Sequence, residues 1–130
     1  MENSVQFIEK TRTQIALELH ERWGLMRGYS RDSVEFLFTV DEWATENDPV
    51  GVTQREYDAL GHICKFCSEN KVLFRAESRR DNNGTIIFSA YVERLLMGER
   101  LCAESEWGES VVSQLLAVLN GILLVDAQEE

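Results

Sequence analysis

Two alternating apolar segments joined by a turn place the strongest constraint on the fold of this chain. Residues 72–78 and 85–92 carry apolar side chains at every second position, which is the period of a strand with one buried face. The link 79–84 ends in Asn83-Gly84, and both residue types tolerate the positive φ that tight hairpin turns need. The sequence therefore predicts an antiparallel hairpin. The side chains expected on its buried face are Val72, Phe74, Ala76, Ile86, Phe88, Ala90 and Val92.

Two strands alone are only marginally stable in water, so other apolar segments of the chain are expected to cover the hairpin. Residues 34–40 alternate and are rich in β-branched and aromatic side chains, which predicts another strand. Residues 93–103 admit two interpretations: a continued strand that turns at Gly98 and returns as another strand, or a short helix that ends at Gly98. We favour the extended interpretation because Tyr91 and Val92 are strand formers and the sheet needs a third or fourth strand.

The first two predicted helices differ in how well their ends are marked. Residues 4–23 have apolar side chains at helical spacing, with Asn3 or Ser4 as a cap and Gly24 or Gly28 as an end. A central helix is expected at about 54–69. Its start is marked by Thr53 and Glu56 as a capping box and by Val52 with Tyr57 as a hydrophobic staple, and Asn70 is expected to be its left-handed terminator. Its expected apolar face is Tyr57, Leu60, Ile63, Cys64 and Cys67.

The C-terminal segment is the most apolar part of the chain. Residues 110–119 are predicted to form a helix capped by Ser110, although Asn120-Gly121 between two apolar runs also fits a second hairpin. The helix would be apolar around about half of its circumference, which is more than a one-sided surface helix needs. We therefore expect this apolar segment to provide a homodimer interface.

These elements predict a single α+β domain over residues 1–130, a length typical of one domain. We expect a mainly antiparallel sheet of three to five strands packed with an N-terminal helix, the central helix and a C-terminal helix. The N-terminus lacks the pattern of a signal peptide, and the longest apolar run, 115–125, is too short to cross a bilayer. The odd number of cysteines, three, favours reduced thiols and a cytoplasmic location.

Candidate catalytic and metal-binding residues are few. Cys64 and Cys67 form a Cys-x-x-Cys with Cys102 as a possible third thiolate, but on a helix His62 would point away from Cys64, so one ion could not be reached by all of them. We predict core thiols, with a small Cys-ligated metalloprotein as the weaker alternative. His20 and His62 are expected on outward faces, and no nucleophile or nucleotide-binding motif is present. We therefore predict no cofactor, no metal and no enzymatic activity.

Charge gives the clearest functional indication. The net charge is −10, and residues 101–130 contain six acidic residues without a Lys or Arg. Such a chain repels nucleic acid and anionic membranes and associates faster with basic partners. We therefore expect neither nucleic acid nor a membrane to be a direct partner. The expected partner is a basic surface on another protein.

Two tryptophans lie within acidic segments, an arrangement that resembles an aromatic anchor inside a charged rim. The predicted partner-binding residues are Asp41, Glu42, Trp43, Glu46, Asp48, Glu104, Glu106, Trp107 and Glu109, and we expect both segments on one solvent-facing side. The simpler alternative is that each tryptophan closes over the core and the acids are merely solvated.

The functional hypothesis is a non-catalytic inhibitor that occupies a basic, nucleic-acid-binding site on a partner. Toxin-neutralising proteins, phage counter-defence proteins and nucleic-acid mimics share this small size and negative charge. The alternative is a dimeric, chaperone-like module that holds a partner peptide on an apolar surface.

Overall fold

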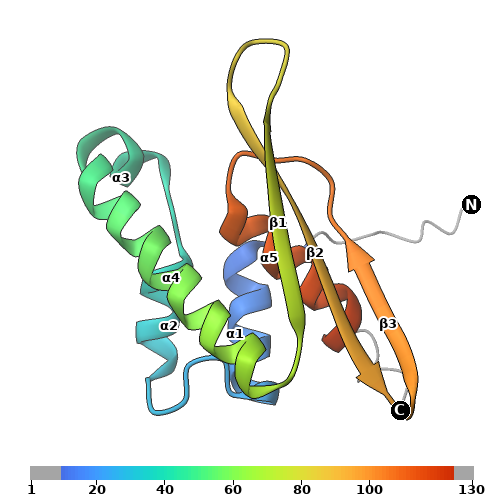
Figure 1. Cartoon of the computed structure of the whole chain (residues 1–130). Helices are drawn as coiled ribbons and strands as arrows, with labels where there is room; N and C mark the ends of the chain where they lie inside the picture. The colour runs from blue at the N-terminus through green and yellow to red at the C-terminus, as the bar shows by residue number, and fades with distance from the viewer. Residues whose placement is uncertain (1–9, 125–130) are drawn as a thin grey trace, which may run out of the picture.

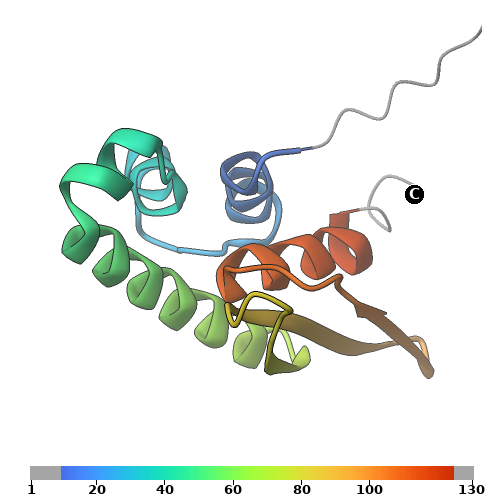
Figure 2. The ribbon, with the colours of Figure 1, turned by 90° about the horizontal axis from the view of Figure 1, so that it is seen from above.

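The computed structural model describes residues 10–124, which form an α+β fold with a three-stranded antiparallel sheet in the order β1-β2-β3. One helix, α5, covers one face of the sheet, and the other face is left uncovered by the helices (Figure 2). The remaining helices lie on the far side of α5 and beside the sheet (Figure 1). The elements are α1 (Arg12–Trp23), α2 (Arg31–Phe38), α3 (Glu42–Asn47), α4 (Pro49–Glu69), β1 (Leu73–Arg80), β2 (Ile86–Leu96), β3 (Glu99–Glu104), α5 (Val111–Leu119) and the π turn η1 (Asn120–Leu124).

The predicted hairpin is confirmed. Strands β1 and β2 pair antiparallel with Phe74 opposite Val92, and Gly84 has a φ of 82° in the turn. Val92 is completely buried, whereas Ile86 near the tip remains 42% exposed. The reason is visible in Figure 1, where the hairpin tip extends beyond the helices that cover its base. The predicted buried face is therefore buried only in the lower half of the hairpin.

The extended interpretation of residues 93–103 is also confirmed. Strand β2 continues to Leu96, the chain turns at Met97 and Gly98, which both have positive φ, and β3 returns antiparallel to β2. A glycine at the second turn position adopts this conformation without the cost of a Cβ. The hairpin and the return strand make up the whole sheet of the described residues.

The strand predicted at residues 34–40 is wrong, because these residues form α2 and the start of the next link. The Ser30 side chain caps the helix by accepting from the Ser33 amide. Val34, Leu37 and Phe38 are all buried, at the i, i+3 and i+4 spacing of one helix face. The β-propensity of this segment is weaker than the gain from packing that face. The acidic segment that follows contains the short helix α3, which Asp41 caps.

Helices α1 and α4 are confirmed with corrected boundaries. The capping box of α1 is formed by Thr11 and Gln14, its left-handed end is Gly24 as predicted, and the start predicted at residue 4 with its Asn3 or Ser4 cap lies outside the described residues. Helix α4 begins at Pro49 with Asp48 as its cap, because proline fits the first helical position, where its missing N–H costs nothing. The predicted capping box is therefore wrong.

The C-terminal end and apolar face of α4 also differ from the prediction. The helix does end at Asn70, but the positive φ belongs to Lys71. Tyr57, predicted to be on the apolar face, is 67% exposed. The buried positions are Ala59, Ile63, Phe66 and Cys67.

Helix α5 is the central helix of the core, and the hairpin alternative for this segment is wrong. It packs against β2 on one side and against α1 and α4 on the other, and Ser110 caps it as predicted. This explains its wide apolar surface, because three neighbours are covered at once. The side chains expected to form a homodimer interface are buried within the same chain: Val112, Leu115, Leu116, Val118, Leu119, Ile122 and Leu123. No helix in residues 10–124 has the length and apolarity needed to cross a bilayer.

A polar cluster around Arg12 connects the helical part to α5. Its guanidinium donates to the carbonyl of Phe38 at 2.8 Å and pairs with the Glu56 carboxylate. The hydroxyl groups of Ser110 and Ser113 each accept from it at 3.2 Å. The Arg12 side chain is only 17% exposed, so one residue of α1 holds the end of α2, the middle of α4 and the start of α5.

Candidate functional site: an acidic and aromatic groove between α2, α3 and α4

Two neighbouring hollows on the helical side form one groove. The first, about 820 Å³, lies between α2 and α4, and the second, about 620 Å³, lies between α2, α3 and α4. Asp32 and Phe36 line both hollows, so the two lie side by side. We call this feature the α2–α4 groove.

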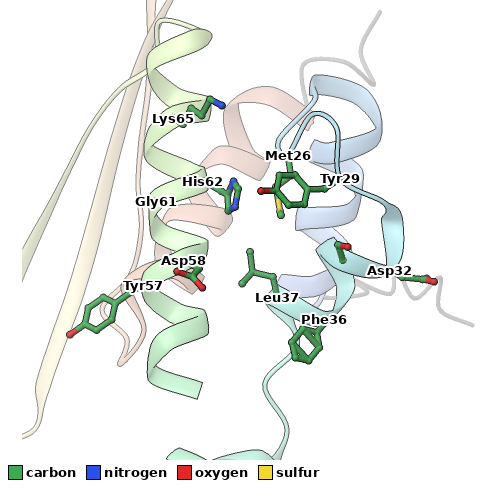
Figure 3. Close-up of a pocket in the computed structure, with 11 residues that line it drawn as sticks. Met26, Tyr29, Asp32, Phe36, Leu37, Tyr57, Asp58, Gly61, His62 and Lys65 are labelled. Atoms are coloured by element: carbon green, nitrogen blue, oxygen red, sulfur yellow. The ribbon is translucent and has the colours of Figure 1, made fainter. Parts of the chain in front are cut away.

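The first hollow has an apolar floor and a mixed rim. Met26 and Leu37 line it, and Tyr29 meets His62 edge to face with 5.2 Å between ring centroids. Figure 3 shows the Asp58 carboxylate on the side of α4 that faces the hollow. Tyr57, which is 67% exposed, also lines the hollow from α4 (Figure 3).

The two histidines therefore differ from the outward positions expected for them. His62 lines the first hollow. His20 is half-buried, and its Nδ1 accepts from the Met26 amide at 3.2 Å while its Nε2 donates to the Tyr29 carbonyl at 3.0 Å. These two bonds use both nitrogens of a neutral imidazole. His20 thus fixes the loop that carries Tyr29 to the groove.

The second hollow combines aromatic rings with carboxylates. Phe36 and Trp43 line it and are 64% and 70% exposed. The Arg55 guanidinium lies 4.9 Å from the centroid of the Phe36 ring. The carboxylates lining the hollow are Asp32, Glu35, Asp41 and Asp48.

These four carboxylates leave the second hollow with an excess of negative charge. Within residues 10–124, none of them lies within 4.0 Å of a basic nitrogen, and Arg55 is the one Lys or Arg of the lining. Asp41 and Asp48 also cap helices, accepting from the Ala44 amide at 2.7 Å and the Gly51 amide at 3.1 Å. Each cap fixes a carboxylate at the rim and uses only part of its capacity as an acceptor.

The groove contains part of the predicted partner-binding site. Asp41, Trp43 and Asp48 line the second hollow. Glu42 and Glu46 are exposed on α3 outside that lining.

The other predicted residues lie elsewhere. Glu104 ends β3, and Glu106, Trp107 and Glu109 lie in the link to α5, which runs beside the hairpin and apart from α3 (Figure 1). The Trp107 ring is half-buried, with the Arg79 guanidinium 4.2 Å from its centroid. The structure therefore gives the two acidic segments different neighbours: α4 for the first and the hairpin for the second.

Three groove residues were missed in the sequence because α2 was interpreted as a strand. On a helix, Asp32, Glu35 and Phe36 are spaced i, i+3 and i+4 and share one side, which here faces α3 and α4. The Ser30 cap and the buried spacing of Val34, Leu37 and Phe38 are the signals that could have revealed this helix.

The cysteines occupy three different environments. Cys67 is buried, and burial together with the nearby Cys64 raises the pKa of its thiol to about 12. Cys64 is half-buried and Cys102 is exposed on β3. In the described part of the chain, no three His, Cys, Asp or Glu side chains gather as a metal site would require. The core-thiol prediction is thus confirmed for Cys67.

Comparisons of the chain with protein-family models, with curated proteins and with solved structures found no match. A function for this protein is therefore inferred from the groove itself.

Proposed function

We propose that this protein is a non-catalytic binding protein whose α2–α4 groove takes an arginine- or lysine-rich segment of a partner protein. The observation that carries this proposal is the second hollow, where Phe36 and Trp43 lie exposed among four carboxylates that form no ion pair within residues 10–124. A groove of this kind combines attraction for a cation with flat apolar surfaces on which its stem can pack.

Arginine–aromatic contacts inside the chain support this chemistry. Arg94 lies over Trp23 and Arg79 over Trp107, at 5.4 and 4.2 Å from the ring centroids. Of the three tryptophans, Trp43 is the one that no arginine of residues 10–124 covers. It is also the most exposed, with Asp41 beside it in the hollow. An arginine from a partner would complete at Trp43 the contact that the chain makes for itself at the other two.

The net charge of −10 supports the same class of partner. It opposes nucleic acid and anionic lipid at long range and accelerates encounters with basic proteins. Basic protein surfaces commonly serve to hold nucleic acid, so occupying one would block it. We therefore retain an inhibitor of the nucleic-acid-mimic, toxin-neutralising or counter-defence type as the functional class.

Peptide binding with charge-matched variants tests the proposal. A fluorescent arginine-rich peptide is titrated with the wild type, with Asp32→Lys/Glu35→Lys, and with Glu106→Lys/Glu109→Lys, which changes the net charge equally. We expect the groove variant to weaken affinity about tenfold more than its control, equivalent to ~1.4 kcal/mol. Equal losses in both variants would mean that binding follows net charge alone and would overturn the groove assignment.

Trp43 provides a second, uncharged test. Trp43→Ala should weaken the same peptide by about fivefold to tenfold, because a cation over an exposed indole contributes roughly 1 kcal/mol. Met97→Ala is the matched control, since Met97 is 97% exposed and lies on the sheet side. An unchanged affinity in Trp43→Ala would remove the aromatic contact from the proposal.

The apolar first hollow favours a second candidate, a chaperone-like site for an apolar peptide segment. Met26, Phe36 and Leu37 line this hollow, and its volume falls within the range of small-ligand pockets. Salt separates the two candidates, because binding of a basic segment weakens as ionic strength rises whereas apolar binding is nearly independent of it.

A further inference from the structure

Strand β3 has one edge whose backbone hydrogen-bonding groups are paired with no other strand of residues 10–124. Phe88 and Gly108 exchange two backbone hydrogen bonds, at 2.7 and 2.9 Å, so the even-numbered residues of β2 direct their N–H and C=O groups toward β3. Such pairs alternate along an antiparallel ladder, and Val92 is opposite Ala103. Arg100, Cys102 and Glu104 must therefore direct their N–H and C=O groups away from β2. No other strand of residues 10–124 pairs with this edge.

The side chains of the same three residues share the uncovered face of the sheet. Cys102 lies opposite Glu93, and the Arg100 guanidinium lies 3.8 Å from the Glu93 carboxylate on that face. The Arg100 side chain is still 67% exposed, and Cys102 and Glu104 are exposed as well. The edge thus presents a basic residue, a small residue and an acidic residue at equal spacing.

This order is complementary to itself when a second copy is turned by 180°. If Cys102 lies opposite Cys102 of another copy, Arg100 lies opposite Glu104 of that copy, and the reverse pair forms on the other side. In each copy, Arg100, Cys102 and Glu104 direct their backbone N–H and C=O groups outward. This register therefore also gives the alternating hydrogen-bonded pairs of an antiparallel ladder. Opposite charges at directly paired positions stabilise antiparallel strands.

We propose that two copies of this chain pair antiparallel through β3, about a two-fold axis at Cys102, and form one continuous six-stranded sheet. The edge is distant from the α2–α4 groove, with β3 and α3 on opposite sides of the molecule (Figure 1). This inference is therefore independent of the proposed function.

The other edge of the sheet argues for β3 as the dimer edge. Strand β1 contains Arg75, Arg79 and Arg80 but a single acid, Glu77. Two copies of such a strand repel each other, and charged edge strands commonly prevent pairing in this way. Strand β3 contains two acids, Glu99 and Glu104, and one base, Arg100, so its excess of one sign is smaller.

Thiol cross-linking tests the register directly. Directly opposed residues that exchange hydrogen bonds have Cα atoms ~5.5 Å apart, which is within disulfide range. Diamide converts two thiols to one disulfide and takes up both protons and both electrons to become a hydrazine. We expect a Cys64→Ala background, in which the buried Cys67 remains, to give a dimer linked through Cys102, identified by mass spectrometry.

Charge variants in that background separate pairing from random collision. Arg100→Glu alone and Glu104→Arg alone each place like charges opposite one another in a homodimer, so each should reduce the cross-linked dimer about tenfold. Mixing the two variants opposes unlike charges again and should restore it as a heterodimer. Equal yields in all samples, or a mixture no better than its components, would overturn the proposal.

A measurement without oxidation completes the test. Sedimentation of reduced protein at about 0.5 M salt, where repulsion between two chains of net charge −10 is screened, should show a monomer–dimer equilibrium. Arg80→Glu, on β1, is the control and should leave that equilibrium unchanged, since Arg80 is exposed and its guanidinium donates to the Gly84 carbonyl of the hairpin turn. If the protein stayed a monomer at every concentration up to about 0.5 mM, any self-association would be weaker than that of specific protein pairs. This result would overturn the proposal.

Discussion

On the sheet side of the molecule, three arginines each lie over an aromatic ring: Arg75 over Tyr91, Arg79 over Trp107 and Arg94 over Trp23. On the helical side, Arg55 covers Phe36, but Trp43 has no arginine of the described chain over it and four carboxylates lie around the same hollow. Both regions therefore place aromatic rings near charges, yet the sheet side pairs each of these three rings internally, whereas on the helical side Trp43 is left open within the described chain.

This difference suggests separate roles for the two regions. An internally paired ring is held in one position and shielded from solvent, so it stabilises the fold. An exposed ring beside unpaired carboxylates contributes little to folding and remains available to a partner. Substitutions should therefore affect stability on the sheet side and binding on the helical side.

The largest expected effect comes from the connection between the two regions. Arg12→Met should lower the free energy of unfolding by about 3 kcal/mol, because it leaves the Glu56 carboxylate and the Phe38 carbonyl, both largely buried, without their partner. Urea denaturation followed by circular dichroism measures this loss. Arg31→Met is the matched control: it removes an exposed pair with Glu21 and should cost less than about 1 kcal/mol. Equal losses would show that the Arg12 cluster does not hold the helices together.

An intermediate effect is expected from replacing one tryptophan of each region by alanine and comparing the two losses of stability. Trp23→Ala should cost about 2 kcal/mol, since the ring packs against the core and under Arg94. Trp43→Ala should stay within about 0.5 kcal/mol of the wild type while weakening binding of the basic peptide. Thermal and urea unfolding of both variants provide the measurement. A large loss of stability in Trp43→Ala would place Trp43 with the structural aromatics and remove the contrast.

The smallest effect on stability at neutral pH is expected from the ionisation of Cys67, near the end of α4. The pKa of the Cys67 thiol is raised from 9.0 to about 12, so the fold favours its neutral form. The resulting contribution of Cys67 to the free energy of unfolding is complete below pH 9 and is lost as the pH rises from 9 toward 12. Between these values, wild-type stability should therefore fall more steeply than that of Cys67→Ala. The raised pKa of Tyr91, to about 12 through its hydrogen bond to Glu93, is present in both proteins and cancels. If the free energies of unfolding of the two proteins changed in parallel between pH 9 and 12, the raised pKa of Cys67 would be contradicted.

Local signals predicted the hairpin, the return strand and the C-terminal helix correctly. Asn83-Gly84, Met97-Gly98 and Ser110 each act within a few residues of themselves, so their effect is readable from the sequence. The segment 34–40 failed for the opposite reason. Its β-branched and aromatic residues favour a strand, and only packing against α1 and α4 makes the helical spacing of Val34, Leu37 and Phe38 favourable.

The sequence by itself determined that this chain is an acidic α+β protein with a hairpin and a strongly apolar C-terminal helix, because composition and short-range periodicity carry that information. Only the tertiary structure decided where the apolar surplus goes, namely into a core between the sheet and two helices. It also decided which acids meet: Asp32 and Glu35 of α2 joined Asp41 and Asp48, while the segment 104–109 lay beside the hairpin. The physical reason is that a surface is made by residues distant in sequence, and their positions depend on the packing of whole helices.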